Sequence, residues 1–284
     1  AHNLSLNHLD PTCDVAIRLD LDERLQPNWR EHLEEAWTPD INNLRYKYIW
    51  SWRKNGDPGL VFYCDRIHAR EGFRWSSATH EGLVCWTGEK KQAVSQDLEI
   101  HHFRKQGKRH KSDLFLLSVA VREQPHDARC QWYYARELDY MGDGRTVDEY
   151  KKYLTKEGGT ITETSYALRR LFCLTGDEKF LHEAAEKASN EPEAWERLAF
   201  VKYQQKKWKA CLAFARSAIA CSSEQTHCSD LDAKARALDL ASVASWQLNE
   251  KPQALEFAVN ALAQLPNDQR ILSNVSAMKQ ILER

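Results

Sequence analysis

The sequence predicts an α/β or α+β part followed by an all-α part built from helical repeats. Before about residue 120, short strand-like runs alternate with turns rich in glycine, proline and asparagine, such as Lys54–Gly59. Beyond that point the pattern is helical nearly to the end, with glycine and proline between the segments. Small residues also recur at matching offsets in successive helix pairs. We therefore place a first domain at residues 1–118 and a second at residues 119–284.

The first domain opens with a strand. Val15, Ile17 and Leu19 alternate with period two, which is typical of a half-buried strand over residues 15–19. A helix is expected over residues 28–36, because Pro27 directly before it suits the start of a helix. Further strand-like pieces follow at Leu44–Trp52, Leu60–Cys64 and Ala93–Ile100.

Helix pairs make up the second domain. The clearest pair runs from Leu238 to Pro266, with a turn at Asn249. Small residues at positions facing the partner helix let antiparallel helices approach closely. In this pair they are Ala241, Ser242, Ala254, Ala258 and Ala261. Corresponding pairs run over Trp195–Ala218 and Leu168–Pro192, with a weaker one at Tyr134–Leu154 and a capping helix at Asn267–Arg284.

This second-domain pattern resembles tetratricopeptide (TPR) repeats in degenerate form. Repeats of that kind stack into a continuous core and leave a concave face. The resemblance implies a protein partner bound on the repeats, and the sequence does not name that partner. An ordinary irregular helical bundle is the alternative.

Composition argues against several classes of protein. The formal net charge is −1 with 29% charged residues, which gives no electrostatic case for binding nucleic acid or an anionic membrane. No apolar run approaches the roughly 18 residues of a membrane helix, and no signal-peptide pattern opens the chain. The eight cysteines form no CxxC pair, which favours free thiols in a reducing compartment over a zinc site. We expect a cytoplasmic protein without a membrane span.

Asp20-Leu21-Asp22-Glu23 is the stretch with the most chemical information. It ends the first predicted strand, and open α/β sheets bind ligands at the carboxyl ends of their strands. In an extended chain Asp20 and Asp22 point to one side, so that both carboxylates share a divalent ion. Such oxygen ligands suit Mg²⁺ or Mn²⁺, and these ions suit a substrate that carries phosphates. A solvated acidic turn is the alternative.

Other segments, in order along the chain, give this motif a context. They are Ala1–Leu6, Leu19–Leu25, Ile67–Trp75, His80-Glu81 and Leu98–His102, with a join to the repeats at Gln124–Arg129 and Tyr133–Leu138. Together they resemble family 2 glycosyltransferases of the GT-A fold, in which an R-N helix precedes a strand ending in D-x-D-E. "K-I-H-R…G-F-R-W" and "H-E" segments follow in that family, and a subgroup of it also carries helical repeats. The resemblance covers nearly the whole chain.

The resemblance implies sugar transfer from a nucleotide-diphosphate donor to a saccharide or protein acceptor, with inversion at the anomeric carbon. Asp20, Asp22 and His102 would hold an Mn²⁺ or Mg²⁺ ion, and the spacing favours His102 over His101. That ion would stabilise the charge that develops on the leaving diphosphate. Glu81 would be the catalytic base that accepts the proton of the acceptor hydroxyl.

Donor contacts follow from the same resemblance. The nucleotide sugar would be bound by Asn3, Asp20, Arg74 and His80. Glu23 would support the metal site or orient the donor sugar, and Trp75 is a candidate sugar platform. His2 stands where the family has an arginine, so the donor-phosphate or structural contact of that arginine is in doubt.

Three functions are compatible with these residues. The first is a cytoplasmic, metal-dependent glycosyltransferase whose repeats bind an acceptor or a partner protein. The second is an interaction scaffold with a vestigial, inactive GT-A portion. The third is a metal-dependent phosphohydrolase, although the extra His and Asp ligands of a two-metal site are lacking. The family's opening strands have no counterpart before Ala1, so we expect a piece of a longer protein, a half supplied elsewhere, or lost activity.

Overall fold

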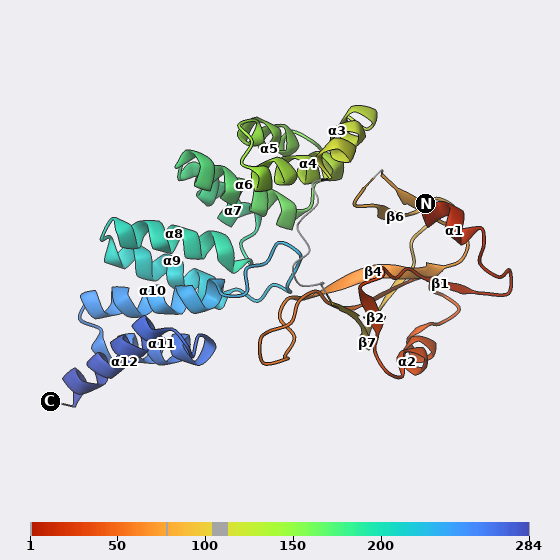
Figure 1. The fold of residues 1–284 in the computed structure, drawn as a ribbon. Coiled ribbons are helices and arrows are strands. Elements are labelled where there is room, and N and C mark those ends of the chain that lie inside the picture. Colours follow the sequence, from red (N-terminus) through yellow and green to blue (C-terminus); the bar gives the residue numbers. More distant parts are fainter. Residues whose placement is uncertain (1, 78, 104–112, 284) are drawn as a thin grey trace. The chain divides into compact units, whose positions relative to one another are not determined.

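The protein forms two compact units in the computed structural model, which describes residues 2–77, 79–103 and 113–283 (Figure 1). The first, here called the sheet unit, comprises residues 1–149, 156–158 and 225–227. The second, the helical unit, comprises residues 150–155, 159–224 and 228–284. The helical pattern of the sequence begins near residue 119, whereas the boundary between the two compact units lies within helix α5 (Thr146–Leu154). Helices α3 (Leu114–Glu123) and α4 (Ala128–Met141) therefore belong to the sheet unit.

A mixed sheet with the strand order β1-β4-β3-β7-β2 is the frame of the sheet unit. Its strands are β1 (Val15–Ile17), β2 (Glu23–Leu25), β3 (Asn43–Ile49), β4 (Val61–Ala69) and β7 (Gln92–His102). Strands β3 and β7 pair in parallel, while the pairs β1–β4, β3–β4 and β2–β7 are antiparallel. The prediction of a strand-rich part ahead of a helical part is confirmed. The pairing does not by itself identify a GT-A fold.

The connection between β1 and β2 differs from the sequence prediction. These are the edge strands of the sheet, so residues 18–22 carry the chain from one edge to the other. Strand β1 ends at Ile17 and pairs antiparallel with β4, so the rule for the carboxyl ends of parallel strands does not apply to it. Asp20 and Asp22 instead lie in a turn, in which the Glu23 N–H donates to the Asp20 carbonyl at 3.0 Å. The extended chain expected at both aspartates is therefore not formed, and the acidic turn that was its alternative is present.

Large side chains from β3, β4 and β7 form the core of the sheet unit. Leu44, Tyr46, Ile67, Leu98 and Ile100 are fully buried there. Helix α2 (Trp29–Ala36) packs on β7 and contributes Leu33 to the same core. The helix predicted over residues 28–36 is thus confirmed. Burial of these side chains holds the sheet together and fixes the strands that carry the candidate site.

A hairpin of β5 (Phe73–Ser76) and β6 (Gly82–Cys85) lies beside helix α1 (His2–Leu6). The Asn3 side chain joins the two, because its Nδ2 donates to the Trp75 carbonyl at 2.8 Å and its Oδ1 accepts from the Trp75 N–H at 2.7 Å. The side-chain amide of Asn3 thereby satisfies both backbone groups of Trp75, as a neighbouring strand would.

Helix hairpins build the helical unit, as the sequence predicts. The helices are α6 (Ile161–Thr175), α7 (Lys179–Lys187), α8 (Pro192–Gln204), α9 (Trp208–Ala220), α10 (Ala233–Gln247), α11 (Lys251–Gln264) and α12 (Gln269–Leu282). Each hairpin packs against the next: α7 against α8, α8 and α9 against α10, and α11 against α12 (Figure 1). Successive hairpins therefore stack in sequence order.

The predicted small residues lie where these helices meet. Ala241, Ala254, Ala258 and Ala261 of the pair α10–α11 are at most 2% exposed. The corresponding residues of the pair α8–α9, which are Ala199, Cys211, Ala215 and Ala218, are fully buried. The predicted turn at Asn249 is present, with a left-handed φ of 63°. The prediction of helical repeats is confirmed.

Within the described part of the chain each cysteine is a free thiol, and Cys130, Cys211, Cys221 and Cys228 are buried. Burial raises the pKa of the Cys211 thiol to about 11. Across the described ranges no helix is both long and apolar enough to cross a membrane.

Candidate functional site

Several predicted site residues lie in one chain of ion pairs on the sheet unit. Arg18 Nη2 is 3.5 Å from Asp20 Oδ1 and 3.4 Å from Glu81 Oε2. Arg66 Nη1 is 3.3 Å from Asp20 Oδ2, and its Nη2 is 2.7 Å from Glu23 Oε1. The chain of charges therefore runs Glu81, Arg18, Asp20, Arg66, Glu23, and it joins segments that are far apart in the sequence.

Glu23 is the buried end of this chain, with a side chain that is 1% exposed. Its Oε1 accepts a short hydrogen bond from the Tyr48 hydroxyl, and its Oε2 accepts from the Asp20 N–H at 2.9 Å. Burial, together with the hydrogen bond to Glu23, raises the pKa of Tyr48, so that its hydroxyl stays protonated and donates. Because Arg66, Tyr48 and Asp20 occupy its oxygens, Glu23 anchors the turn between β1 and β2.

Asp22 and His102 form a second feature at the same edge of the sheet. His102 is the last residue of β7 and pairs with Glu23 of β2, and its Nε2 lies 3.7 Å from Asp22 Oδ2. The other ring nitrogen, Nδ1, lies 2.9 Å from the Trp50 carbonyl oxygen. A carbonyl only accepts, so Nδ1 carries the proton and donates. The Trp50 ring also stacks on the imidazole, with centroids 4.5 Å apart at an angle of 8°, which fixes the orientation of the ring.

This geometry fits part of the predicted metal set. His102 Nε2 faces Asp22 Oδ2 at a distance too long for a hydrogen bond, so an imidazole nitrogen and a carboxylate, both metal-ligating groups, meet across a gap. A donation from the second ring nitrogen to a backbone carbonyl is also what orients metal-ligating histidines. Asp20 does not complete the set here, since Arg18 and Arg66 occupy its carboxylate. Within the described ranges no group of at least three His, Cys, Asp or Glu residues is arranged to hold a metal ion.

Glu81 and His80 take different positions. Glu81 is bound to the ion-pair chain through Arg18, whose guanidinium also lies 4.5 Å above the Trp75 ring. His80, by contrast, has a left-handed backbone with φ of 51°, and its ring stacks on Tyr133 with centroids 3.8 Å apart. The structure thus brings Glu81, but not the His80 ring, into the polar cluster.

Asn3 and Arg74 lie apart from that cluster. Asn3 uses its amide on the backbone of Trp75, which is a structural role. Arg74 alternates along β5 with the buried Phe73 and Trp75, so its side chain is on the opposite, exposed face of the hairpin. The donor contacts predicted for these residues stay predictions, and this arrangement does not gather them with Asp22.

Sequence reasoning missed the residues that hold the cluster together, which are Arg18, Arg66, Tyr48 and Trp50. Arg18 lies two residues before Asp20 and was the one available signal, because a cation near three carboxylates forms ion pairs. Arg66 and Tyr48 lie on β4 and β3, and their place depends on which strands pair. That pairing is not contained in any local pattern.

The helical unit carries a second polar arrangement, here called the charged ladder, made of Glu196, Arg236, Asp239 and Arg270. Arg236 of α10 reaches Glu196 of α8 at 3.1 Å. One turn along α10, Asp239 binds both terminal nitrogens of Arg270 of α12, at 3.0 and 2.7 Å. The ladder therefore links the first helices of successive hairpins by ion pairs of alternating sign.

Taken together, the chain is a protein of two units, a sheet unit with a polar cluster and a unit of stacked helical hairpins. No protein-family model matches it, and no curated protein matches it either. Solved structures that align with it under 20% identity include several TPR proteins.

Three of these alignments illustrate the similarity. The APC/C hetero-tetramer Cut9–Hcn1 aligns with a TM-score of 0.45 and 12% identity, over 60% of this chain and 33% of that chain. A thermophilic TPR protein of Thermus thermophilus aligns with a TM-score of 0.37 and 15% identity, over 59% and 89%. YrrB, a TPR protein with an unusual peptide-binding site, aligns with a TM-score of 0.41 and 15% identity, over 57% and 80%. At these TM-scores the alignments add nothing to what the helix pairs show on their own.

Proposed function

We propose that the helical unit is a protein-binding scaffold, and that this is the main role of the chain. The observation that carries the proposal is the charged ladder on the first helices of the hairpins. Its side chains are held in place before a partner arrives, so binding loses little side-chain entropy. Arg236 and Arg270 are its more exposed members, at 36% and 58%, so the ladder presents cations that favour an acidic partner segment.

Selection from a library of displayed random peptides against the full chain tests this proposal. Arg270 is 58% exposed, so Arg270→Gln removes a ladder charge with little effect on folding. We expect the selected peptides to bind this variant about tenfold more weakly, as loss of one charge-assisted hydrogen bond predicts. Arg216→Gln on α9, at 50% exposure and outside the ladder, is the matched control. Equal affinity for both variants, or no enrichment at all, contradicts the proposal.

We propose metal-dependent glycosyl transfer as a second function, favoured by the facing pair Asp22 and His102. A divalent cation held there by these two residues would neutralise charge on the leaving nucleoside diphosphate. Glu81 is the residue we assign as base: the acceptor oxygen bonds to the anomeric carbon, the bond from that carbon to the diphosphate breaks, and Glu81 takes the hydroxyl proton. Arg18 positions Glu81 for this role.

Binding of Mn²⁺ alone, followed by electron paramagnetic resonance, tests the metal site without a donor. We expect the signal of free Mn²⁺ to fall on addition of the chain, and Asp22→Ala or His102→Ala to restore it. Asp57→Ala, in the turn between β3 and β4, is the control. Binding of UDP- and GDP-sugars with and without Mn²⁺ then tests the transferase itself. Donor binding that persists in Asp22→Ala would show that the assignment of the metal site is wrong.

A further inference from the structure

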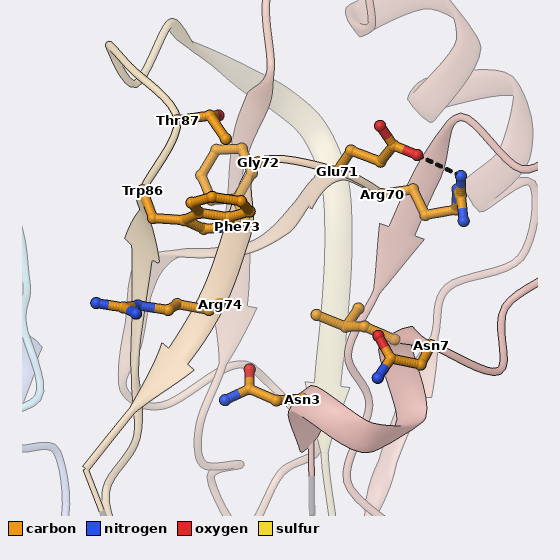
Figure 2. A pocket seen from close by; sticks show the side chains of 10 residues that line it. Asn3, Asn7, Arg70, Glu71, Gly72, Phe73, Arg74, Trp86 and Thr87 are labelled. Carbon is orange, nitrogen blue, oxygen red and sulfur yellow. Dashed lines mark hydrogen bonds and ion pairs between the residues drawn. The ribbon is translucent and has the colours of Figure 1, made fainter.

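A pocket of about 910 Å³ lies on the sheet unit, away from the acidic edge. Helix α1 contributes Asn3 and Leu6 to its lining, followed by Asn7, and the turn from β4 to β5 contributes Arg70–Gly72. The remaining wall comes from the β5–β6 hairpin and the residues after it, which are Phe73, Arg74, Trp86 and Thr87. Figure 2 shows Trp86 and Phe73 on one side of the view and Asn7 on the other, with Arg74 extending from β5.

Its chemical character is set by one available cation and one exposed indole. Arg70 is paired with Glu71 at 2.5 Å, so its charge is largely compensated. Arg74 is exposed and has no hydrogen-bond or ion-pair partner among the described residues. The Trp86 side chain is 61% exposed, which is unusual for so large an apolar ring. Asn7 and Thr87 add neutral hydrogen-bonding groups beside it.

The backbone holds these groups in a defined arrangement. Gly72 has φ of +83°, and a Cβ at this position would lie 2.5 Å from Thr87 Oγ1. The Trp86 N–H also donates to the Gly72 carbonyl at 3.0 Å. Glycine at this position therefore lets the turn before β5 approach Trp86 and Thr87 closely, so the wall of the pocket is built before any ligand arrives.

The cation of the pocket faces away from the polar cluster because side chains alternate along β5. Trp75 points toward Arg18, whose guanidinium lies 4.5 Å above its ring, while its neighbour Arg74 points to the other face. The steps proposed above for the scaffold and the transferase use neither Trp86 nor Thr87, although the glycosyltransferase resemblance implied donor contacts for Asn3 and Arg74 of this lining.

We propose that this pocket binds a sugar ring that carries an anionic group. The C–H face of a pyranose packs on an exposed indole, and its hydroxyl edge matches amide and hydroxyl groups such as those of Asn7 and Thr87. The Arg74 guanidinium then binds the anionic substituent, either a carboxylate or a phosphate, through charge-assisted hydrogen bonds. Phe73, the other aromatic residue of the lining, is 5% exposed, so it offers no second open ring face to sandwich a flat base.

Titration of the full chain with sodium glucuronate, glucose 6-phosphate and glucose, without metal, tests the proposal. The readout is the ¹⁵N-indole resonance of Trp86, assigned with Trp86→Phe. We expect one or both anionic sugars to bind at least about tenfold more tightly than glucose, as one charge-assisted contact predicts. The tighter of the two identifies the carboxylate or the phosphate as the group recognised. Added NaCl should weaken their binding and leave that of glucose unchanged.

Variants separate the two parts of the site. Arg74→Gln should reduce the affinity for the anionic sugars to that for glucose, while Trp86→Ala should abolish binding of all three. Arg30→Gln on α2, at 69% exposure, is a matched control with no expected effect. Equal affinity for the three sugars, absence of any shift at Trp86, or an Arg74→Gln variant that keeps its preference overturns the proposal. Because Mn²⁺ and peptides are absent from this experiment, its outcome is independent of the transferase and scaffold proposals.

Discussion

Glu23 and Arg66 form an ion pair in which both side chains are largely removed from water, at 1% and 13% exposure. Removing two charges from water costs several kcal/mol, and the cost is offset only where hydrogen bonds satisfy the remaining atoms. Here Tyr48 and the Asp20 N–H provide those bonds to Glu23. The pair therefore ties the turn after β1 to the middle of the sheet, since Tyr48 is on β3 and Arg66 on β4.

Truncation of Glu23 should be far more costly than truncation of Asp20. Glu23→Ala leaves Arg66 buried without its main partner, so we expect a loss of about 3–5 kcal/mol in the free energy of unfolding. Asp20 is 46% exposed, and Asp20→Ala should cost no more than about 1 kcal/mol. Urea denaturation of both variants measures the difference. Similar losses for the two variants would mean that the buried pair does not anchor the turn.

His68 should make stability depend on pH. Burial lowers the pKa of His68, while the charges of Asp65 and Lys90 act in opposite directions. The unfolded chain then binds a proton at a higher pH than the folded chain, so the free energy of unfolding falls as pH drops below about 6.5. We expect His68→Gln to be less stable at neutral pH but to lose less stability between pH 7.5 and pH 5.5. Parallel pH curves for variant and parent would contradict this assignment.

The site could be predicted from the sequence only as far as its local motifs reach. Asp22 and His102 were predicted as partners and do lie side by side, because a short acidic turn and the end of β7 meet across the β2–β7 pair. Asp20 was predicted to face the same ion, yet its carboxylate is bound by Arg66 from β4. That contact depends on the path of residues 18–22 across the sheet, which no local pattern encodes.

Elements differ in how well the sequence predicts them. The helix pairs follow from local information, since Ala254, Ala258 and Ala261 recur on the buried face of α11 and Asn249 marks the turn before it. Strands β1, β3, β4 and β7 were also located, although β4 and β7 extend beyond the predicted ranges, whereas β2, β5 and β6 were not predicted. Which strands are neighbours was not predictable, because pairing joins residues such as Val15 and Ala69 that are distant in the sequence.

The turn into β5 offers a test of how its backbone is fixed. Gly72 and Gly56 have similar φ values of +83° and +88°, but a Cβ on Gly56 would meet nothing within 4 Å whereas one on Gly72 would meet Thr87. Alanine at either position should cost about 1–2 kcal/mol from the left-handed backbone. Gly72→Ala should lose more than Gly56→Ala because of the added clash. Adding Thr87→Ala to Gly72→Ala should recover that excess, as measured by denaturation; without any recovery, the close approach to Thr87 is not the cause.

At the scale of the whole molecule, the two compact units predict two separate responses to a cavity. Leu168 of α6 and Leu44 of β3 are both fully buried, one in each unit. Truncation to alanine should cost about 2–5 kcal/mol in either case, because transfer and cavity contributions add. The free energy of opening should fall only for the unit that carries the cavity, since local opening follows cooperative units.

Amide hydrogen exchange, followed peptide by peptide, distinguishes the units directly. Leu168→Ala should accelerate exchange in α6–α11 while β3, β4 and β7 keep the rates of the parent. Leu44→Ala should do the reverse, and so serves as the matched control. If either substitution accelerates exchange in both sets of peptides alike, the two cores unfold as a single cooperative unit. Exchange confined to the altered unit means instead that the charged ladder and the sheet pocket can be varied one at a time, without disturbing each other's fold.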